Sequence, residues 1–240
     1  MARAYDETEL LRRLAEIPPK RPGSSLPAPP GKRISLGGIP DPPLDQTVVT
    51  VDRYACLGSN LFPGKISEAQ LAVGVTSPNP REGRTVVASN LAAFFAVDTR
   101  DETVLVDLSF RRPRVHEVFG VPSSPGILES VRTRSVALSR TAIPGLWVLP
   151  LGFSDFGRMT FDRVLELRET IAALKRAFRF VVVDMPPVLQ SDFPGMVSSQ
   201  LEGYFVVVAS GSTRITEVRD GVRILNLQKI IGFVMTGSGK

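Results

Sequence analysis

The chain has 240 residues, 43% of them hydrophobic, and a formal net charge of +5, which predicts one globular domain with an appendage. No run reaches the roughly 18 apolar residues of a membrane helix, and no signal-peptide pattern opens the chain, so we expect a cytoplasmic protein. Because Cys56 is the only cysteine, no intrachain disulfide can form, and we expect it to be a small buried side chain.

The excess positive charge is spread along the chain and gathers in a few local clusters. These clusters are Lys20-Arg21, Lys32-Arg33, Arg111-Arg112-Pro113-Arg114 and the pair Arg132/Arg134. Such charges usually form a solvated face, and they also suit an anionic partner such as an acidic protein tail or anionic lipid. No aromatic interleaving or nucleic-acid motif accompanies them, so we expect no nucleic-acid partner.

The N-terminal segment predicts a short amphipathic helix within residues 1–17, which Pro18 and Pro19 would end. Its apolar face would consist of Leu10, Leu11, Leu14 and Ile17. Residues 18–47 are rich in Pro, Gly and Ser, the composition of an extended linker. A helix on such a tether either docks on another protein or folds back on its own domain, and the residues leave both readings open.

Residues 48–240 are predicted to form the globular domain, in which short apolar runs alternate with helical segments. The expected strands are 71–76, 104–107, 146–149, 180–184, 204–209 and 230–235, and the expected helices are 85–97, 159–177 and 215–227. The strands are almost continuously apolar, as in parallel strands covered on both faces. We therefore predict an α/β fold, a doubly wound, mostly parallel sheet flanked by helices, whose ligands bind beyond the carboxyl ends of the strands.

The segment TSPNPREGRT, residues 76–85, lies between the first expected strand and the first expected helix, where a nucleotide-binding protein places its phosphate loop. Gly83 and Thr85 fit that role. Arg84 stands where a compact lysine ammonium would, and Arg81 stands where a tight loop favours glycine. Taken alone, the segment is also compatible with an ordinary turn between a strand and a helix.

Two aspartates at strand ends strengthen the reading as a phosphate site. Asp107 ends the apolar run VLVD, and Asp184 ends the run FVVVD. NTPases place carboxylates at such positions to hold magnesium, directly or through water. Either residue alone would also be explained as a helix cap.

At this point the sequence resembles a known family. The stretches TSPNPREGRTVVASNLAAFFA, VLVDLSFRRPRVHEVFG, PGILESV and FVVVDMPPVL are similar in order and spacing to the bacterial tyrosine kinase (BY-kinase, CpsD/CapB type) family, from about residue 52 to residue 236. The resemblance implies a P-loop NTPase fold related to the MinD/ParA group. It also implies a cytoplasmic role beside a membrane polysaccharide co-polymerase in capsule or exopolysaccharide synthesis.

Compared position by position, the chemically demanding residues of the family are partly replaced. The family has glycine where Arg81 stands and its catalytic lysine where Arg84 stands, whereas Thr85 matches the hydroxyl that binds magnesium. Asp107 and Asp184 match two family carboxylates, while a further aspartate is replaced by Ser109.

The elements that the family uses for assembly and autophosphorylation also differ. The Glu-x-x-Arg-x-x-Arg segment aligns with Asp52, Ala55 and Gly58, so both arginines are missing and oligomerisation is doubtful. There is no tyrosine-rich tail, since the tyrosines are Tyr5, Tyr54 and Tyr204. Because phosphoryl transfer depends on positioning and charge stabilisation, these losses favour a protein without efficient kinase activity.

We therefore predict a degenerate member of this family that regulates or scaffolds polysaccharide synthesis, held at the inner face of the membrane through its partner. Its candidate contacts are the N-terminal helix and Arg111, Arg112 and Arg114. If ATP or ADP and Mg²⁺ still bind, the resemblance predicts Asp107 and Asp184 as catalytic and Thr85, Asp107 and Asp184 as metal-binding. The predicted nucleotide-binding residues are Pro80, Glu82, Gly83, Arg84, Thr85 and Val86.

Two alternative functions remain open. The first is an active ATP-dependent tyrosine autokinase or ATPase in which Arg84 replaces the lysine. The second is a MinD/ParA-like positioning ATPase. Two features argue against it: the sequence has no amphipathic C-terminal helix and no lysine near the start of the loop.

Overall fold

The computed structural model describes residues 70–133, 135–153 and 161–237. The predicted helix within 1–17, the linker 18–47 and the segment compared with the oligomerisation motif lie outside these residues. The proposed division of the chain at residue 48 therefore stays a prediction. No helix in the described ranges combines the length and apolar character that crossing a membrane requires.

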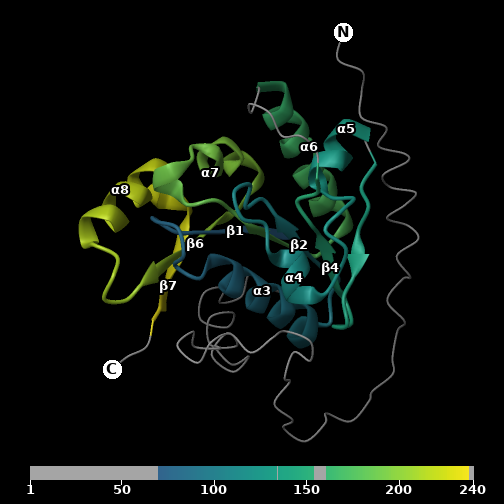
Figure 1. The fold of residues 1–240 in the computed structure, drawn as a ribbon, viewed down its shortest axis with the longest axis horizontal. Coiled ribbons are helices and arrows are strands. Elements are labelled where there is room, and N and C mark those ends of the chain that lie inside the picture. The colour runs from purple at the N-terminus through teal and green to yellow at the C-terminus, as the bar shows by residue number, and fades with distance from the viewer. Residues whose placement is uncertain (1–69, 134, 154–160, 238–240) are drawn as a thin grey trace, which may run out of the picture.

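The described residues form a seven-stranded sheet in the order β3-β4-β2-β5-β1-β6-β7 (Figure 1). The strands are β1 (Leu71–Thr76), β2 (Thr103–Asp107), β3 (Ser139–Arg140), β4 (Leu146–Leu149), β5 (Phe180–Asp184), β6 (Gly203–Ala209) and β7 (Ile230–Thr236). All neighbouring pairs are parallel except β3 with β4. The predicted mostly parallel α/β sheet is confirmed.

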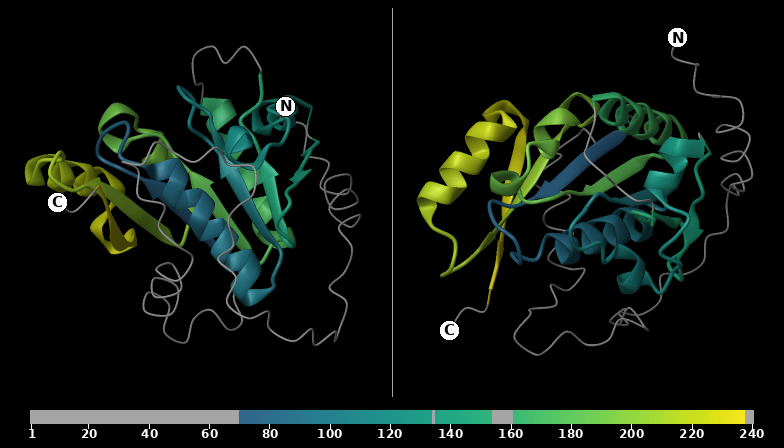
Figure 2. Two further views of the ribbon diagram at one scale, coloured as in Figure 1. Left: turned by 60° about the horizontal axis from the view of Figure 1, so that its bottom comes forward. Right: turned by 45° about the horizontal axis from the view of Figure 1, so that its top comes forward.

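Helices cover both faces of this sheet. They are α3 (Arg84–Phe94), α4 (Val115–Phe119), α5 (Ile127–Thr133), α6 (Phe161–Ala177), α7 (Phe193–Met196) and α8 (Ile215–Leu225). Figure 2 shows α3 lying lengthwise against one face and α6 against the other. In Figure 1, α4 lies on the side of α3, whereas α5, α7 and α8 lie on the side of α6.

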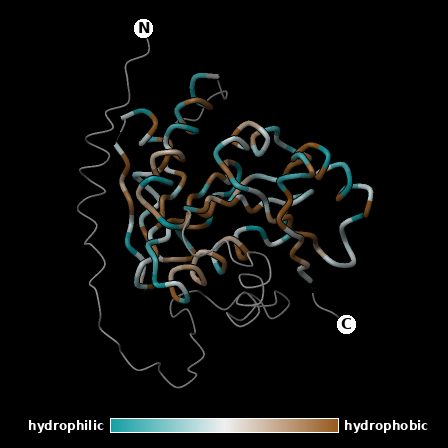
Figure 3. The backbone as a smooth tube through the Cα atoms, turned by 180° about the vertical axis from the view of Figure 1, so that it is seen from behind, coloured by the Kyte–Doolittle hydropathy of each residue, from teal (hydrophilic) through white to brown (hydrophobic). Residues whose placement is uncertain are grey.

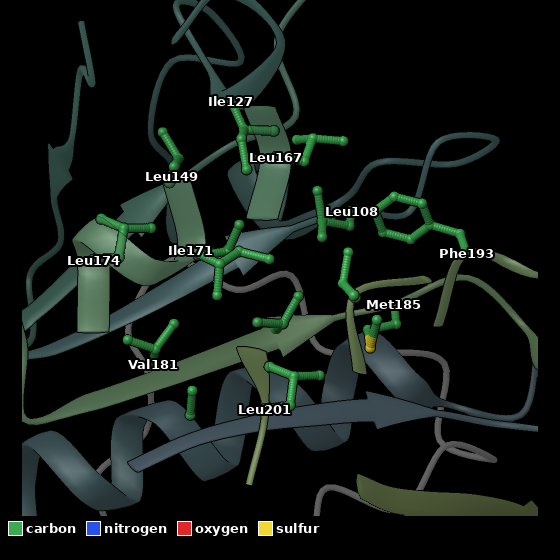
Figure 4. Packing of buried hydrophobic residues seen from close by; sticks show 14 of the residues in the cluster. Leu108, Ile127, Leu149, Leu167, Ile171, Leu174, Val181, Met185, Phe193 and Leu201 are labelled. Atoms are coloured by element: carbon green, nitrogen blue, oxygen red, sulfur yellow. The ribbon is translucent and has the colours of Figure 1, made fainter. Parts of the chain in front are cut away.

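The buried side chains divide into two cores, one on each face of the sheet. One core joins the strands to α3 and α4, and the other joins them to α5, α6, α7 and α8. Figure 3 shows the central strands as mostly apolar and the outer segments as mostly polar. Figure 4 shows the second core, in which Leu167, Ile171 and Leu174 of α6 pack over the sheet. Burial on both faces explains why the strands are almost continuously apolar.

The structure differs from the sequence prediction mainly at helix ends. The helix expected at 85–97 is an α-helix only to Phe94, and residues Phe95–Thr99 form a π-helix. The helix expected at 215–227 ends at Leu225, because Asn226 takes a positive φ of 67° that stops the helix. The predicted start of α6 at residue 159 lies outside the described residues, and the short helices α4, α5 and α7 were not predicted.

Candidate functional site

The carboxyl ends of β1, β5 and β2 meet at one edge of the sheet, and the loops that follow them build the candidate site. In the parallel pairing of β2 with β5, Asp107 and Asp184 are register partners. In the pairing of β1 with β5, Val75 is the partner of Asp184. The register therefore brings both aspartates beside the loop that follows β1.

That loop joins β1 to α3 through two residues in the left-handed backbone conformation. Arg81 takes a φ of 64° and Gly83 a φ of 88°, and Gly83 caps α3. The described residues offer no hydrogen-bond acceptor to the backbone N–H groups of Arg81, Glu82, Gly83 and Arg84. Free N–H groups beside a helix N-terminus attract anions.

Glu82 anchors the loop to distant parts of the chain. Its buried carboxylate accepts hydrogen bonds from the backbone N–H of Asn79 at 3.0 Å and from the hydroxyl of Thr213. Its carbonyl oxygen accepts a hydrogen bond from the hydroxyl of Thr236 at 2.8 Å. Because Thr213 follows β6 and Thr236 ends β7, the loop is fixed against the two strands that complete the sheet beyond β1.

The Arg84 side chain turns back into the loop. Its Nη1 atom donates to Ser77 Oγ at 2.8 Å and to the carbonyl oxygen of Asn79 at 3.0 Å, while Nε is buried without a partner among the described residues. Burial lowers the pKa of Arg84, and the charges of Asp184 and Glu82 oppose this shift. The guanidinium is thus engaged by the oxygen atoms of the loop itself.

Thr85 and Asp184 are in direct contact. Thr85 Oγ1 donates to Asp184 Oδ2 at 2.7 Å, and Ser109 Oγ donates to the same oxygen at 3.1 Å. Asp184 is fully buried, and its Oδ1 atom has no hydrogen-bond partner among the described residues. Burial and the charge of Asp107 raise the pKa of Asp184 to about 7, although Thr85, Arg84 and Ser109 oppose this shift.

Asp107 has different partners. Its Oδ1 accepts from the backbone N–H of Ser109 at 2.9 Å, and its Oδ2 accepts from those of Arg114 and Val115, each at 3.1 Å. Burial raises the pKa of Asp107, while these N–H bonds and His116 oppose the shift. Asp107 thus caps the N-terminus of α4 with Oδ2, while its Oδ1 holds the loop that follows β2.

A magnesium ion fits part of this arrangement. The Thr85 hydroxyl and the unpartnered Asp184 Oδ1 are oxygen ligands of the kind that Mg²⁺ takes alongside phosphate and water. Ser109 supplies no carboxylate, and both Asp107 oxygens are engaged. In the described ranges there is no group of three or more His, Cys, Asp or Glu suited to a metal ion.

Beside the loop lies a pocket of about 860 Å³ between the segments that follow β1, β2 and β5. Its lining includes Pro80, Arg81, Arg84, Ser109, Phe110, Arg111, Arg112, Pro186, Pro187, Gln190, Asp192, Phe193 and Met196. The pocket therefore has several arginines, an aromatic part and one acidic side chain.

The structure brings most of the sequence-predicted residues to this edge. Glu82, Gly83, Arg84 and Thr85 form the loop and the start of α3, while Val86 exposes its side chain. The sequence analysis did not identify Asn79 and Thr213 as partners of Glu82, nor Phe110 and Phe193 as part of a pocket. No local signal marks the Glu82–Thr213 contact, because 131 positions separate its partners.

No protein-family model matches the chain. In sequence, the chain is 25% identical over 140 residues to the tyrosine-protein kinase ptk of Acinetobacter johnsonii, covering 57% of this chain and 19% of that protein. It is 24% identical over 191 residues to the tyrosine-protein kinase YwqD of Bacillus subtilis, covering 78% of this chain and 80% of that protein. It is 23% identical over 172 residues to the succinoglycan biosynthesis transport protein ExoP of Rhizobium meliloti, covering 68% of this chain and 22% of that protein.

Solved structures agree with this sequence similarity. The kinase domain of the Escherichia coli tyrosine kinase ETK superposes with a TM-score of 0.67 at 21% identity, over 78% of this chain and 75% of that one. The septum site-determining protein MinD from Pyrococcus horikoshii, in complex with Mg-ADP, gives a TM-score of 0.55 at 17% identity, over 69% of this chain and 70% of that one. The predicted resemblance to bacterial tyrosine kinases and the MinD-type P-loop fold are confirmed.

Proposed function

We propose that the chain is a degenerate, bacterial tyrosine-kinase-like P-loop protein that regulates or scaffolds capsular or exopolysaccharide synthesis without efficient phosphoryl transfer. Relatives named as tyrosine-protein kinases and as a succinoglycan biosynthesis transport protein support the general role. Since the chain spans only 19% of the first of these relatives, the activity of that whole protein is not transferred to it.

The engagement of Arg84 by its own loop carries the proposal. The guanidinium donates to Asn79 and Ser77 instead of facing outward as a free cation, so a phosphate group would have to displace these bonds. The engagement of both Asp107 oxygens by backbone N–H groups, and the presence of Ser109 in place of a carboxylate, leave fewer free carboxylate oxygens in the metal region. Because phosphoryl transfer relies on charges placed in advance, each of these features lowers its rate.

The proposed partner is a membrane polysaccharide co-polymerase, which would hold the chain peripherally at the cytoplasmic face of the membrane. Arg111 and Arg112 are exposed and have no carboxylate partner among the described residues. Charge reversal at both, or deletion of residues 1–43, should reduce the amount of co-polymerase recovered in a pull-down. Unchanged recovery with both variants would contradict this part of the proposal.

A second candidate, nucleotide binding with slow or no turnover, is favoured by the Thr85–Asp184 contact and by the free N–H groups of the loop. ATP and ADP fit if Arg84 moves. In that case the loop amides and Thr85 would hold the phosphates, and Thr85 and Asp184 would hold magnesium, which supplies charge neutralisation. A MinD/ParA-like positioning ATPase has support from the fold alone.

Calorimetric titration of ATP and ADP, with and without magnesium, tests these candidates. We expect weak binding by the unaltered chain and tighter binding by an Arg84→Lys variant, because a lysine cannot make the same paired contacts with Ser77 and Asn79. Arg219→Lys, at an exposed position on α8, is the matched control. Efficient ATP turnover or tyrosine autophosphorylation by the unaltered chain, detected by immunoblot, would overturn the proposal.

A further inference from the structure

The pocket beside the phosphate loop has an unusual charge balance. Its lining contains Arg81 and Arg84 from the loop after β1 and Arg111 and Arg112 from the loop after β2, against a single acidic residue, Asp192. Arginine residues from two separate loops therefore line one pocket. Arginine groups in this arrangement suit a phosphate, because each presents several N–H donors in a fixed plane.

Three of these arginines have no carboxylate partner among the described residues. Arg81, Arg111 and Arg112 are exposed, and Arg111 Nη1 donates to Gln190 Oε1 at 3.5 Å. By contrast, the neighbouring Arg114 is paired with Glu117 at 2.9 Å. Among the described residues, no carboxylate therefore competes with an external anion for Arg81, Arg111 and Arg112.

The pocket also has an apolar part. The rings of Phe110 and Phe193 meet edge to face, with centroids 4.9 Å apart and an interplanar angle of 88°. Phe193 is anchored in the core that it shares with Leu108 and Met185 (Figure 4), while Met196 is 46% exposed. A flat apolar group entering the pocket would find aromatic and thioether surface to pack against.

We propose that this pocket binds a phosphotyrosyl side chain presented by a partner protein. The phosphate would be held by Arg111, Arg112 and Arg81, and the phenyl ring would pack against Phe110 and Met196. A phosphotyrosine carries close to two negative charges and three acceptor oxygens, which matches several unpaired guanidinium groups better than a single carboxylate does. The volume of about 860 Å³ lies within the range of small-ligand sites.

One of the two departures from the phosphate-loop pattern points to the same use. Arg81, in place of glycine, and Arg84, in place of lysine, both line this pocket. Arg81 therefore adds a guanidinium group that can hold an existing phosphate, whereas the guanidinium of Arg84 donates to Ser77 and Asn79 of its own loop. The inference rests on the proposed regulatory function, since it specifies what the chain would recognise on its partner.

The test uses the full chain and a fluorescent peptide in which one phosphotyrosine is flanked by alanines. Fluorescence anisotropy at about 0.15 M salt should show at least roughly tenfold tighter binding of this peptide than of its unphosphorylated form. A phosphoserine peptide should bind more weakly than the phosphotyrosine peptide, because it lacks the ring. Arg111→Gln and Arg112→Gln should each weaken phosphotyrosine binding roughly tenfold through loss of charge-assisted hydrogen bonds, whereas Arg219→Gln on α8 should not.

Equal binding of the phosphorylated and unphosphorylated peptides would overturn the inference, as would affinity that survives both pocket substitutions. Equal binding of phosphoserine and phosphotyrosine would also overturn it, by reducing the pocket to a general phosphate site. ATP turnover is measured in the same samples. Efficient turnover with selective phosphotyrosine binding would overturn only the proposed lack of catalysis, and absent turnover without selective binding would overturn only the phosphotyrosine site.

Discussion

The ends of β2 and β5 carry the same sequence signal, an aspartate after a buried apolar strand, and they use it differently. Asp107 and Asp184 are register partners and are both fully buried. The oxygens of Asp107 accept three backbone N–H groups, whereas Asp184 is held by two hydroxyls and keeps one oxygen without a partner among the described residues.

This difference gives Asp107 a structural role and leaves one oxygen of Asp184 without a partner among the described residues. Backbone N–H groups are fixed donors that can only be satisfied by an acceptor, so they commit Asp107 to the cap of α4. The hydroxyls of Thr85 and Ser109 can rotate and can also act as acceptors, so Asp184 can exchange its partners when a ligand arrives. An aspartate at a strand end therefore indicates a metal site only when its oxygens are free.

The largest expected effect comes from replacing each aspartate by its neutral isostere. Asp107→Asn should lower the free energy of unfolding by about 4 kcal/mol, because an amide NH₂ would face buried N–H donors that need an acceptor. Asp184→Asn should leave stability unchanged or raise it, because it removes a buried charge beside Asp107. Urea unfolding at about pH 8 measures both. Equal losses would mean that the two carboxylates have the same role.

The second prediction uses pH to sharpen the comparison. The pKa of Asp184 is about 7 in the folded chain and about 3.9 when unfolded, so the folded state holds the extra proton between these values. The stability gained from this carboxyl is therefore fully present below about pH 4 and is lost as the pH rises to about 7. We place the proton on Asp184, because both Asp107 oxygens already accept N–H groups.

The measurement is urea unfolding of the unaltered chain and of Asp184→Asn at several pH values. Relative to the variant, the unaltered chain should lose on the order of 3 kcal/mol between about pH 5 and pH 8. The variant serves as the control for all other titrating groups. A constant difference between the two proteins across this range, or one of the opposite sign, would contradict the assignment.

The third prediction concerns the missing carboxylate at Ser109. Ser109→Asp places another carboxyl beside Asp184 and Asp107, so in the presence of a chelator it should lower the free energy of unfolding by about 2 kcal/mol. Excess Mg²⁺ should restore part of this loss by neutralising the carboxylates. Ser109→Asn, similar in shape and uncharged, is the control. If magnesium affects the two variants equally, no metal site lies at this edge.

The sequence predicted the sheet well because burial on both faces forces its strands to be apolar along their whole length. Strands β1, β4 and β5 have the same first and last residues as the strands predicted from the sequence. The short helices α4, α5 and α7 were missed because their apolar periodicity extends over few turns. Asp107 caps α4 from the end of β2, and the sequence analysis gave a helix cap only as an alternative explanation of this residue.

The candidate site was predictable to a similar extent. That Thr85 and Asp184 lie close follows from a strand-to-helix loop beside a parallel strand, and their order along the chain indicated it. The inward turn of Arg84 and the anchoring of Glu82 by Thr213 depend on side-chain packing between distant segments. Residue types alone indicated a phosphate loop, and only the contacts show that the loop binds its own cation.

The smallest expected effect tests whether the Asp107 cap depends on backbone or side chains. Arg114 donates to Asp107 through its backbone N–H, while its side chain forms an exposed ion pair with Glu117 at 2.9 Å. Arg114→Ala keeps the N–H and removes only the exposed pair, so the free energy of unfolding should fall by less than about 0.5 kcal/mol. Urea unfolding of Arg114→Ala and of Asp107→Asn under the same conditions compares the two losses of stability. A loss that approaches that of Asp107→Asn would mean that the side chain of Arg114, rather than its backbone, holds the end of β2 in place.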